Sequence, residues 1–172
     1  DPFIYQEDGI YYMVATATNT DVGDDWWHLW RATKDFNDPD NVWEDLGYVI
    51  DENTETGGEK ISDVNHWAPE LYKYKNNYYI FTTIEIKNES NVVEGRGCAV
   101  FKSDKLVDNN KAANFQLISY HMEDTNEVKG RITDPNHYFI DGHLFVENNT
   151  PYMVYVREHV SSPYHSGMMY AS

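Results

Sequence analysis

Residues 1–14 read DPFIYQEDGIYYMV, and the same pattern returns without gaps as APELYKYKNNYYIF at residues 68–81 and DGHLFVENNTPYMV at residues 141–154. Each copy is an apolar stretch, a polar turn and an aromatic-rich stretch, which is the sequence pattern of a β-hairpin. A unit that returns at a long period is typical of a repeat architecture. The repeat therefore predicts three hairpins in equivalent positions of one fold.

The segments after each copy add further predicted strands, and no helical spacing of apolar residues is sustained. These strands are WHLWRAT at 27–33, residues 42–49, GCAVFKS at 97–103, FQLISYH at 115–121 and GMMYAS at 167–172. Four strands per unit are typical of a β-propeller blade. A sandwich would hold three hairpins, but it would not explain the further strands between them. We therefore predict an all-β fold of the propeller type.

The predicted blades divide the chain into residues 1–66 for blade 1, 67–137 for blade 2 and 138–172 for an incomplete blade 3. Propellers typically have four to eight blades. We expect the remaining blades to come from a part of the polypeptide that lies outside these residues, with completion by another chain as the alternative.

Composition narrows the class of partner. Thirteen basic and 29 acidic residues give a net charge of −16, which argues against nucleic acid because phosphate contact needs a basic surface. No apolar stretch reaches the roughly 18–20 residues of a membrane helix, so no membrane partner is expected. Aromatic residues make up 15% of the chain and suit both strands and sugar-stacking surfaces. A neutral substrate is the natural expectation.

The first residue of each copy matters most for function: Asp1, Ala68 and Asp141. If the three hairpins surround a common axis, these residues face the same central space. Two carboxylates would then meet there, and paired carboxylates serve acid–base chemistry. The alternative for Asp1 is a strand-start residue before proline, and for Asp141 a turn residue before glycine.

The motifs DPFI…DGIYYM, HWAPELYKYKNNYYIFTT and IDGHLFVENNTPYMVYV resemble the first three blades of glycoside hydrolase family 43. The resemblance covers nearly the whole chain and implies a five-bladed β-propeller, of which about two and a half blades are present. It also implies a glycosidase acting on α-L-arabinofuranosides, β-xylosides or arabinan, with an oligosaccharide or polysaccharide as substrate. In the family the DP aspartate is the general base, which matches Asp1. The ID aspartate orients the acid and tunes its pKa, which matches Asp141.

The family's catalytic acid is a Glu in an EGP-like motif after the ID aspartate, and this sequence contains no EGP. Glu94 precedes Asp141, and Glu158 follows it by only 17 positions. Neither residue is assigned as the acid. We therefore expect the chain to end before its catalytic acid and to be inactive alone.

Four further residues are candidates for substrate binding. Trp67 and Ala68 stand at the head of the second copy, where an indole face can stack on a sugar ring; packing in the core is the alternative for Trp67. Glu70 is a candidate with a hydrogen-bonding structural role as its alternative. His143 shares a strand face with Asp141 and is either a partner of the site or a structural histidine.

No histidine spacing indicates a metal site, and no cofactor is expected. Family members often carry a cation or water on the propeller axis, so a structural cation there is left open. Two further functions remain as alternatives: a carbohydrate-binding propeller or fragment without catalysis, and a fructan-cleaving propeller hydrolase. The fructan-cleaving class places Asn-Gly after its proline, whereas Phe3-Ile4 follows Pro2 here.

Overall fold

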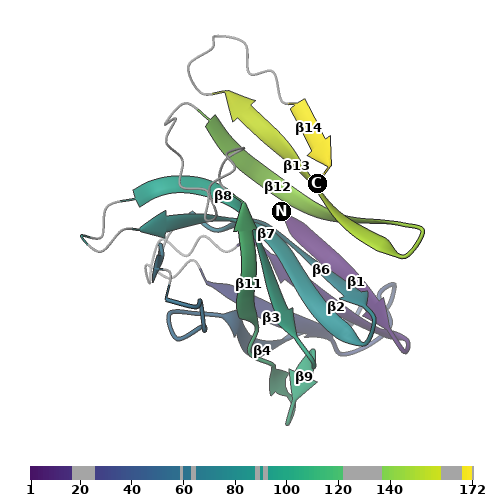
Figure 1. Ribbon diagram of the computed structural model, residues 1–172. Helices are drawn as coiled ribbons and strands as arrows, with labels where there is room; N and C mark the ends of the chain where they lie inside the picture. Colours follow the sequence, from purple (N-terminus) through teal and green to yellow (C-terminus); the bar gives the residue numbers. More distant parts are fainter. Residues whose placement is uncertain are drawn as a thin grey trace.

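The computed structural model describes residues 1–16, 26–58, 60–62, 65–87, 90, 93–121, 137–159 and 168–171 (Figure 1). These residues form antiparallel strands and no helix, which confirms the predicted all-β class. Within the described part of the chain, no helix has the length and apolar character needed to cross a membrane.

The strands form three main sheets. The first sheet has the order β1-β2-β3-β4, with β1 (Pro2–Glu7), β2 (Ile10–Ala15), β3 (Trp27–Ala32) and β4 (Trp43–Ile50). The second sheet has the order β11-β8-β7-β5, with β6 also paired to β7; its strands are β5 (Lys60–Ile61), β6 (Trp67–Tyr74), β7 (Asn77–Lys87), β8 (Val93–Ser103) and β11 (Gln116–His121). The third sheet has the order β12-β13-β14, with β12 (His137–Glu147), β13 (Thr150–His159) and β14 (Met168–Ala171). A two-stranded ribbon joins β9 (Val107–Asp108) to β10 (Lys111–Ala112).

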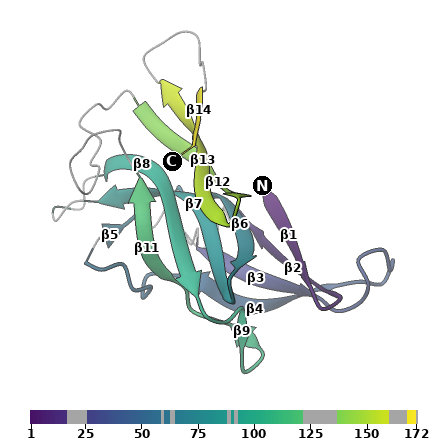
Figure 2. The same ribbon diagram turned by 45° about the vertical axis from the view of Figure 1, so that its right-hand side comes forward.

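The three copies of the repeat form the three predicted hairpins, β1/β2, β6/β7 and β12/β13. Their turns use residues with left-handed backbone, such as Asn76 and Asn149, as the polar turn pattern predicts. The first strands of the hairpins lie side by side, because β6 contacts both β1 and β12. Figure 2 shows β6 between these two strands, and the N-terminus lies close to β12 in both views.

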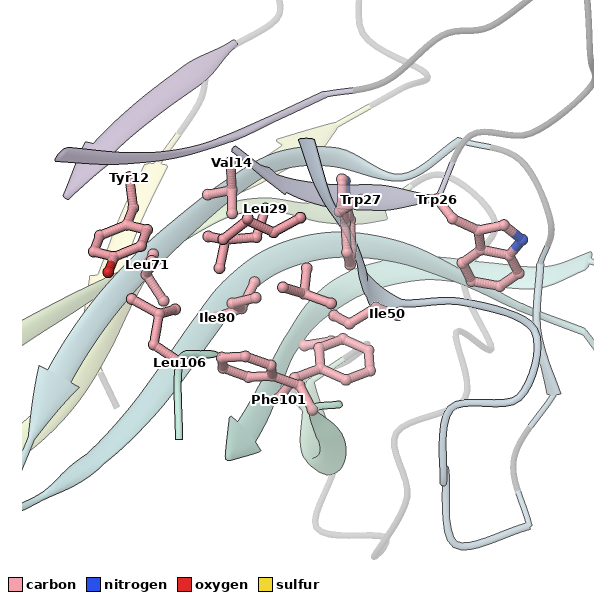
Figure 3. Close-up of a cluster of buried hydrophobic side chains, with 14 of the residues drawn as sticks. Tyr12, Val14, Trp26, Trp27, Leu29, Ile50, Leu71, Ile80, Phe101 and Leu106 are labelled. Atoms are coloured by element: carbon pink, nitrogen blue, oxygen red, sulfur yellow. The ribbon is translucent and has the colours of Figure 1, made fainter. Parts of the chain in front are cut away.

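The main core lies between the first and second sheets. In Figure 3, Val14, Leu29 and Trp27 project from the first sheet toward Ile80 and Phe101 of the second. Trp27 and Phe101 are fully buried and meet edge to face, with ring centroids 6.1 Å apart. Large aromatic and aliphatic side chains in such a layer supply most of the hydrophobic stabilisation. The first sheet thus covers one face of the second.

A smaller core joins the second and third sheets. It contains Cys98, Phe139 and Tyr155, with Met153 packed against them. Phe139 and Tyr155 are perpendicular, with centroids 5.3 Å apart. The third sheet therefore covers the opposite face of the second, so the three sheets stack as consecutive layers.

Strand β12 begins at His137, before the third copy starts, and runs through Asp141 and Gly142. The alternative of a turn residue at Asp141 therefore does not hold, because the chain accommodates Asp141 in a β-bulge rather than in a turn.

Candidate active site

The second and third copies begin with the same irregularity. In β6 the register with β7 shifts between Trp67 and Glu70, and in β12 the register with β13 shifts between Ile140 and His143. In each case the first strand advances three residues while its partner advances two, so one extra residue is inserted. Both strands therefore carry a bulge at the position where the repeat starts.

The residue at each bulge has a left-handed backbone. Ala68 has φ of 46° and Asp141 has φ of 55°. Residues other than glycine adopt this region at a cost, which is lower for Asp than for Ala. Such strain is found where the surrounding structure fixes a residue for function. The bulge interrupts the ladder and lifts the head of each copy out of the regular pleat.

A hydrogen-bonded path links the head of the first copy to that of the second. The Thr16 amide donates to the carbonyl oxygen of Asp1 at 3.2 Å. The hydroxyl oxygen of Thr16 accepts from the Ala68 amide at 2.9 Å. Asp1 and Ala68 are therefore held on either side of one threonine.

The path continues from the second head to the third through β7. The Thr82 hydroxyl donates to the carbonyl oxygen of Trp67 at 2.8 Å. The hydroxyl oxygen of the next residue, Thr83, accepts from the Asp141 amide at 2.9 Å. Both threonines are fully buried, and as neighbours on β7 they lie on opposite faces of the second sheet. Asp141 is thereby fixed to the strand that also fixes Trp67.

Cys98 lies directly beneath the bulge of β12. It is the register partner of Thr83, and a Cβ atom added at Gly142 would come within 3.2 Å of the Cys98 Cβ. Burial and the neighbouring Asp141 carboxylate raise the pKa of the thiol. The thiol therefore stays protonated and inert, as expected of a packing residue rather than a nucleophile.

Trp67 is backed by a cation. The guanidinium carbon of Arg96 lies 3.8 Å from the centroid of the indole ring. Arg96 Nη2 in turn contacts Glu85 Oε1 at 2.6 Å, and Asn65 donates to the other oxygen of Glu85 at 3.0 Å. Stacking of this kind holds an indole in one orientation. With one face against Arg96, Trp67 has only the opposite face for a sugar ring.

Glu70 and His143 meet across the second and third sheets. His143 Nδ1 lies 2.6 Å from both Glu70 Oε2 and the Tyr72 hydroxyl, and that hydroxyl also donates to Glu70. Burial and the bond to Glu70 raise the pKa of Tyr72, so the phenol keeps its proton. Since the carboxylate only accepts, the three groups are satisfied when His143 carries a proton on Nδ1. Glu70 and His143 are thus hydrogen-bonded to each other and to Tyr72, and their role in substrate binding stays a prediction.

The predicted site residues occupy the chain start and the inner strands β6 and β12. Asp1 and Asp141 are exposed, whereas Trp67 and Ala68 are half-buried. That the two carboxyl groups open into one cavity stays a prediction. Among the described residues, no group of three His, Cys, Asp or Glu side chains is arranged to hold a metal ion.

Sequence reasoning missed Tyr72, Arg96 and the two threonines whose hydroxyl oxygens accept hydrogen bonds from the backbone amides of the repeat heads. Thr16 and Thr83 stand fifteen positions after Asp1 and Ala68. That shared spacing was a usable signal, because it places both hydroxyls at one position of the repeat. Arg96 had no comparable signal, since its place beside Trp67 depends on the register of β7 with β8.

Comparison with known proteins decides the family. A family model described as glycosyl hydrolases family 43 matches residues 1–172. The chain belongs to glycosyl hydrolases family 43. A search of curated proteins finds no match for it.

Three solved structures show the fold of this family 43 chain. A thermostable family-43 glycoside hydrolase has 22% identity and a TM-score of 0.63, over 99% of this chain and 46% of that one. An exo-1,5-α-L-arabinanase from a bovine ruminal metagenomic library has 12% identity and a TM-score of 0.58, over 99% and 53%. A family 43 β-xylosidase/α-arabinofuranosidase from a compost microbial metagenome has 20% identity and a TM-score of 0.52, over 90% and 41%. The chain thus spans about half the length of these structures, and the predicted β-propeller is confirmed.

Proposed function

We propose that this chain forms part of a glycoside hydrolase that cleaves plant cell-wall pentose glycans with inversion of configuration. The substrate class is α-L-arabinofuranosides, β-xylosides or arabinan. One observation carries the proposal. Asp1 and Asp141 match the family's base and tuning aspartates, and they stand at equivalent repeat heads. Hydrogen bonds connect these heads through β6 and β7. The similar structures include an arabinanase and a β-xylosidase/α-arabinofuranosidase, which supports the pentose assignment.

The proposed chemistry divides between two sides of the scissile bond. Asp1, ionised, takes a proton from water as the water attacks the anomeric carbon. A carboxylic acid on the opposite side protonates the leaving oxygen, and inverting pairs stand roughly 6.5–9.5 Å apart to leave room for the water. Asp141 raises the pKa of that acid through its like charge and so keeps it protonated. Because no residue of this chain matches the acid motif, the proposal requires the acid from the rest of a five-bladed propeller.

A propeller that binds carbohydrate without cleaving it is the alternative function. Such a protein would keep the aromatic surface at Trp67 and would not need Asp1 as a base. The two functions differ in what Asp1 does, so substitution of that residue separates them.

The test measures hydrolysis of aryl α-L-arabinofuranosides and β-xylosides by the full-length protein, with the product anomer followed by NMR. Asp1→Asn should lower kcat by roughly 10²–10⁴-fold, the usual contribution of a general base. Asp8→Asn is the matched control, because Asp8 lies exposed in the turn of the same hairpin and Asn tolerates its left-handed backbone. A retained anomer, or an unchanged rate in Asp1→Asn, would remove the proposed mechanism. Binding of oligosaccharide without hydrolysis would favour the second function.

A further inference from the structure

Two threonines at the same position of the repeat make the same contact. Thr16 and Thr83 stand fifteen positions after the heads of the first and second copies. Each accepts, at 2.9 Å, the backbone N–H of the head of the next copy: Ala68 for Thr16 and Asp141 for Thr83. The contact therefore repeats from hairpin to hairpin.

The threonine hydroxyls supply hydrogen-bond acceptors for backbone N–H groups at the two bulges. An extra residue in β6 or β12 loses its place in the ladder, and a backbone N–H without a partner in a buried layer costs free energy. The threonine oxygen supplies that partner. Its branched side chain has few rotamers, so the acceptor is held in one place.

We propose that Thr16 and Thr83 are positioning residues of the active site. Each accepts a hydrogen bond from the strained head of the following repeat, a contact called the hook below. The hook holds that head so that the side chain of the head points at the reaction centre. Thr83 sets the direction of the Asp141 carboxylate. Thr16 joins Ala68 to Asp1, since its own amide donates to the Asp1 carbonyl. The catalytic consequence rests on the proposed function, whereas the hook itself rests only on geometry.

The third copy shows how to test the hook without disrupting the strand. Val156 stands at the equivalent position, fifteen residues after Asp141, and lies within β13. Valine therefore fits this place in the repeat, and it has the shape of threonine without the acceptor. Thr83→Val removes the hydrogen bond, and Thr83→Ser restores the hydroxyl. Thr33→Val is the matched control, because the Thr33 hydroxyl bonds to the backbone of Val42 in an exposed turn far along the chain from the repeat heads.

Kinetics of the full-length enzyme separate positioning from general support. Thr83→Val should lower kcat by roughly 10- to 100-fold with little change in KM, as expected when a reacting group is misplaced by about 1 Å. It should also move the alkaline limb of the pH–rate profile to lower pH, because a displaced Asp141 raises the pKa of the acid less. Thr16→Val should lower kcat while leaving that limb in place, since Thr16 does not contact Asp141. Thr83→Ser and Thr33→Val should resemble wild type.

A second readout does not depend on activity. Cys98 lies beneath the bulge and is fully buried, so its alkylation by iodoacetamide reports whether the bulge is held down. Mass spectrometry of the Cys98 peptide should show alkylation at least several-fold faster in Thr83→Val than in wild type, Thr83→Ser or Thr33→Val. In wild-type protein, hydrogen exchange at the Asp141 amide should be strongly protected, and this measurement needs no variant.

The readouts distinguish three failures. Unchanged Cys98 alkylation in Thr83→Val, or an unprotected Asp141 amide in wild type, would overturn the hook. Faster alkylation in a protein that hydrolyses no pentoside would uphold the hook and refute the proposed function. Faster alkylation and a lower kcat with an unmoved alkaline limb would overturn the assignment of Thr83 as a positioning residue for Asp141.

Discussion

Replacing Glu85 by Gln should destabilise the protein far more than the same change at an exposed glutamate. Glu85 is only 6% exposed, and both of its carboxylate oxygens are used, one by Arg96 and the other by Asn65. The change keeps the size of the side chain but removes the charge. The largely buried Arg96 guanidinium then loses the Glu85 carboxylate, while it still lies over the Trp67 ring.

The expected cost follows from burial. Breaking a buried ion pair by removing one partner costs about 3–5 kcal/mol, and Gln keeps one acceptor, so we expect about 3 kcal/mol for Glu85→Gln. Arg31 and Glu44 form a pair of similar geometry at 2.7 Å, but the Glu44 side chain is 47% exposed. Exposed pairs contribute about 0.2–1 kcal/mol. Glu44→Gln should therefore cost less than about 1 kcal/mol.

The assay is urea unfolding of wild type, Glu85→Gln and Glu44→Gln in the full-length protein. At a typical urea dependence of about 2–3 kcal/mol per molar, Glu85→Gln should lower the midpoint by about 1 M. Adding Arg96→Met to Glu85→Gln should recover part of that loss, because it removes a buried charge that has lost the Glu85 carboxylate and keeps the apolar stem. Equal costs at Glu85 and Glu44, or no recovery with Arg96→Met, would refute the reasoning from buried charge.

Two further predictions concern the contact between the first two sheets and the bulge of β6. Partial burial alone would raise the pKa of Glu7, but hydrogen bonds from Lys73 and Tyr78 outweigh it and hold that pKa below its usual 4.5. The stabilisation is therefore complete above about pH 4.5 and lost as pH falls through the lowered pKa, so Glu7→Gln should flatten the acid side of a stability–pH curve measured by urea unfolding. Ala68→Gly should stabilise the fold by about 0.5 kcal/mol, because relief of about 1 kcal/mol of left-handed strain exceeds the extra chain entropy of glycine. Ala99→Gly in the buried, regular strand β8 should instead destabilise, and a loss of similar size at both positions in thermal unfolding would contradict the strain at Ala68.

The hairpins were predictable because their signals are local. Period-two apolar patterning on both sides of a polar turn decides strand, turn and strand within about fourteen residues. The three copies agree with one another, so each strengthens the interpretation of the others. The short strands β5, β9 and β10 were not predicted, since two residues carry no pattern of their own.

The bulges were not predictable from the same signals. Asp141-Gly142 is a frequent turn pair, and local propensity alone favours a turn there. The strand continues because β12 pairs with β13 on both sides of the bulge and Thr83 supplies the partner for the Asp141 amide. Both conditions depend on residues distant in sequence, so only tertiary structure shows them.

The candidate site was predictable in position but not in partners. The repeat placed Asp1, Ala68 and Asp141 at equivalent heads. The hydrogen bonds that link these heads follow from the fold. Their hydrogen-bond partners come from β2 and β7, and the backing of Trp67 comes from β8. Strand register determines which residues become such partners. A sequence repeat reveals a partner only where the partner residue itself is repeated, as with the two threonines.

Alternation along the second sheet separates stability from function. Ile80, Ile84 and Phe101 point to the first sheet and form the main core, while Thr83 and Cys98 point to the third sheet. Neighbouring residues of one strand therefore serve different layers. The main core stabilises the second sheet from the face that carries Ile80, so strained backbone and polar contacts at the repeat heads can persist without unfolding it. For that reason we expect substitution of Thr83 itself to affect catalysis at modest cost in stability, and substitution of Ile80 to do the reverse.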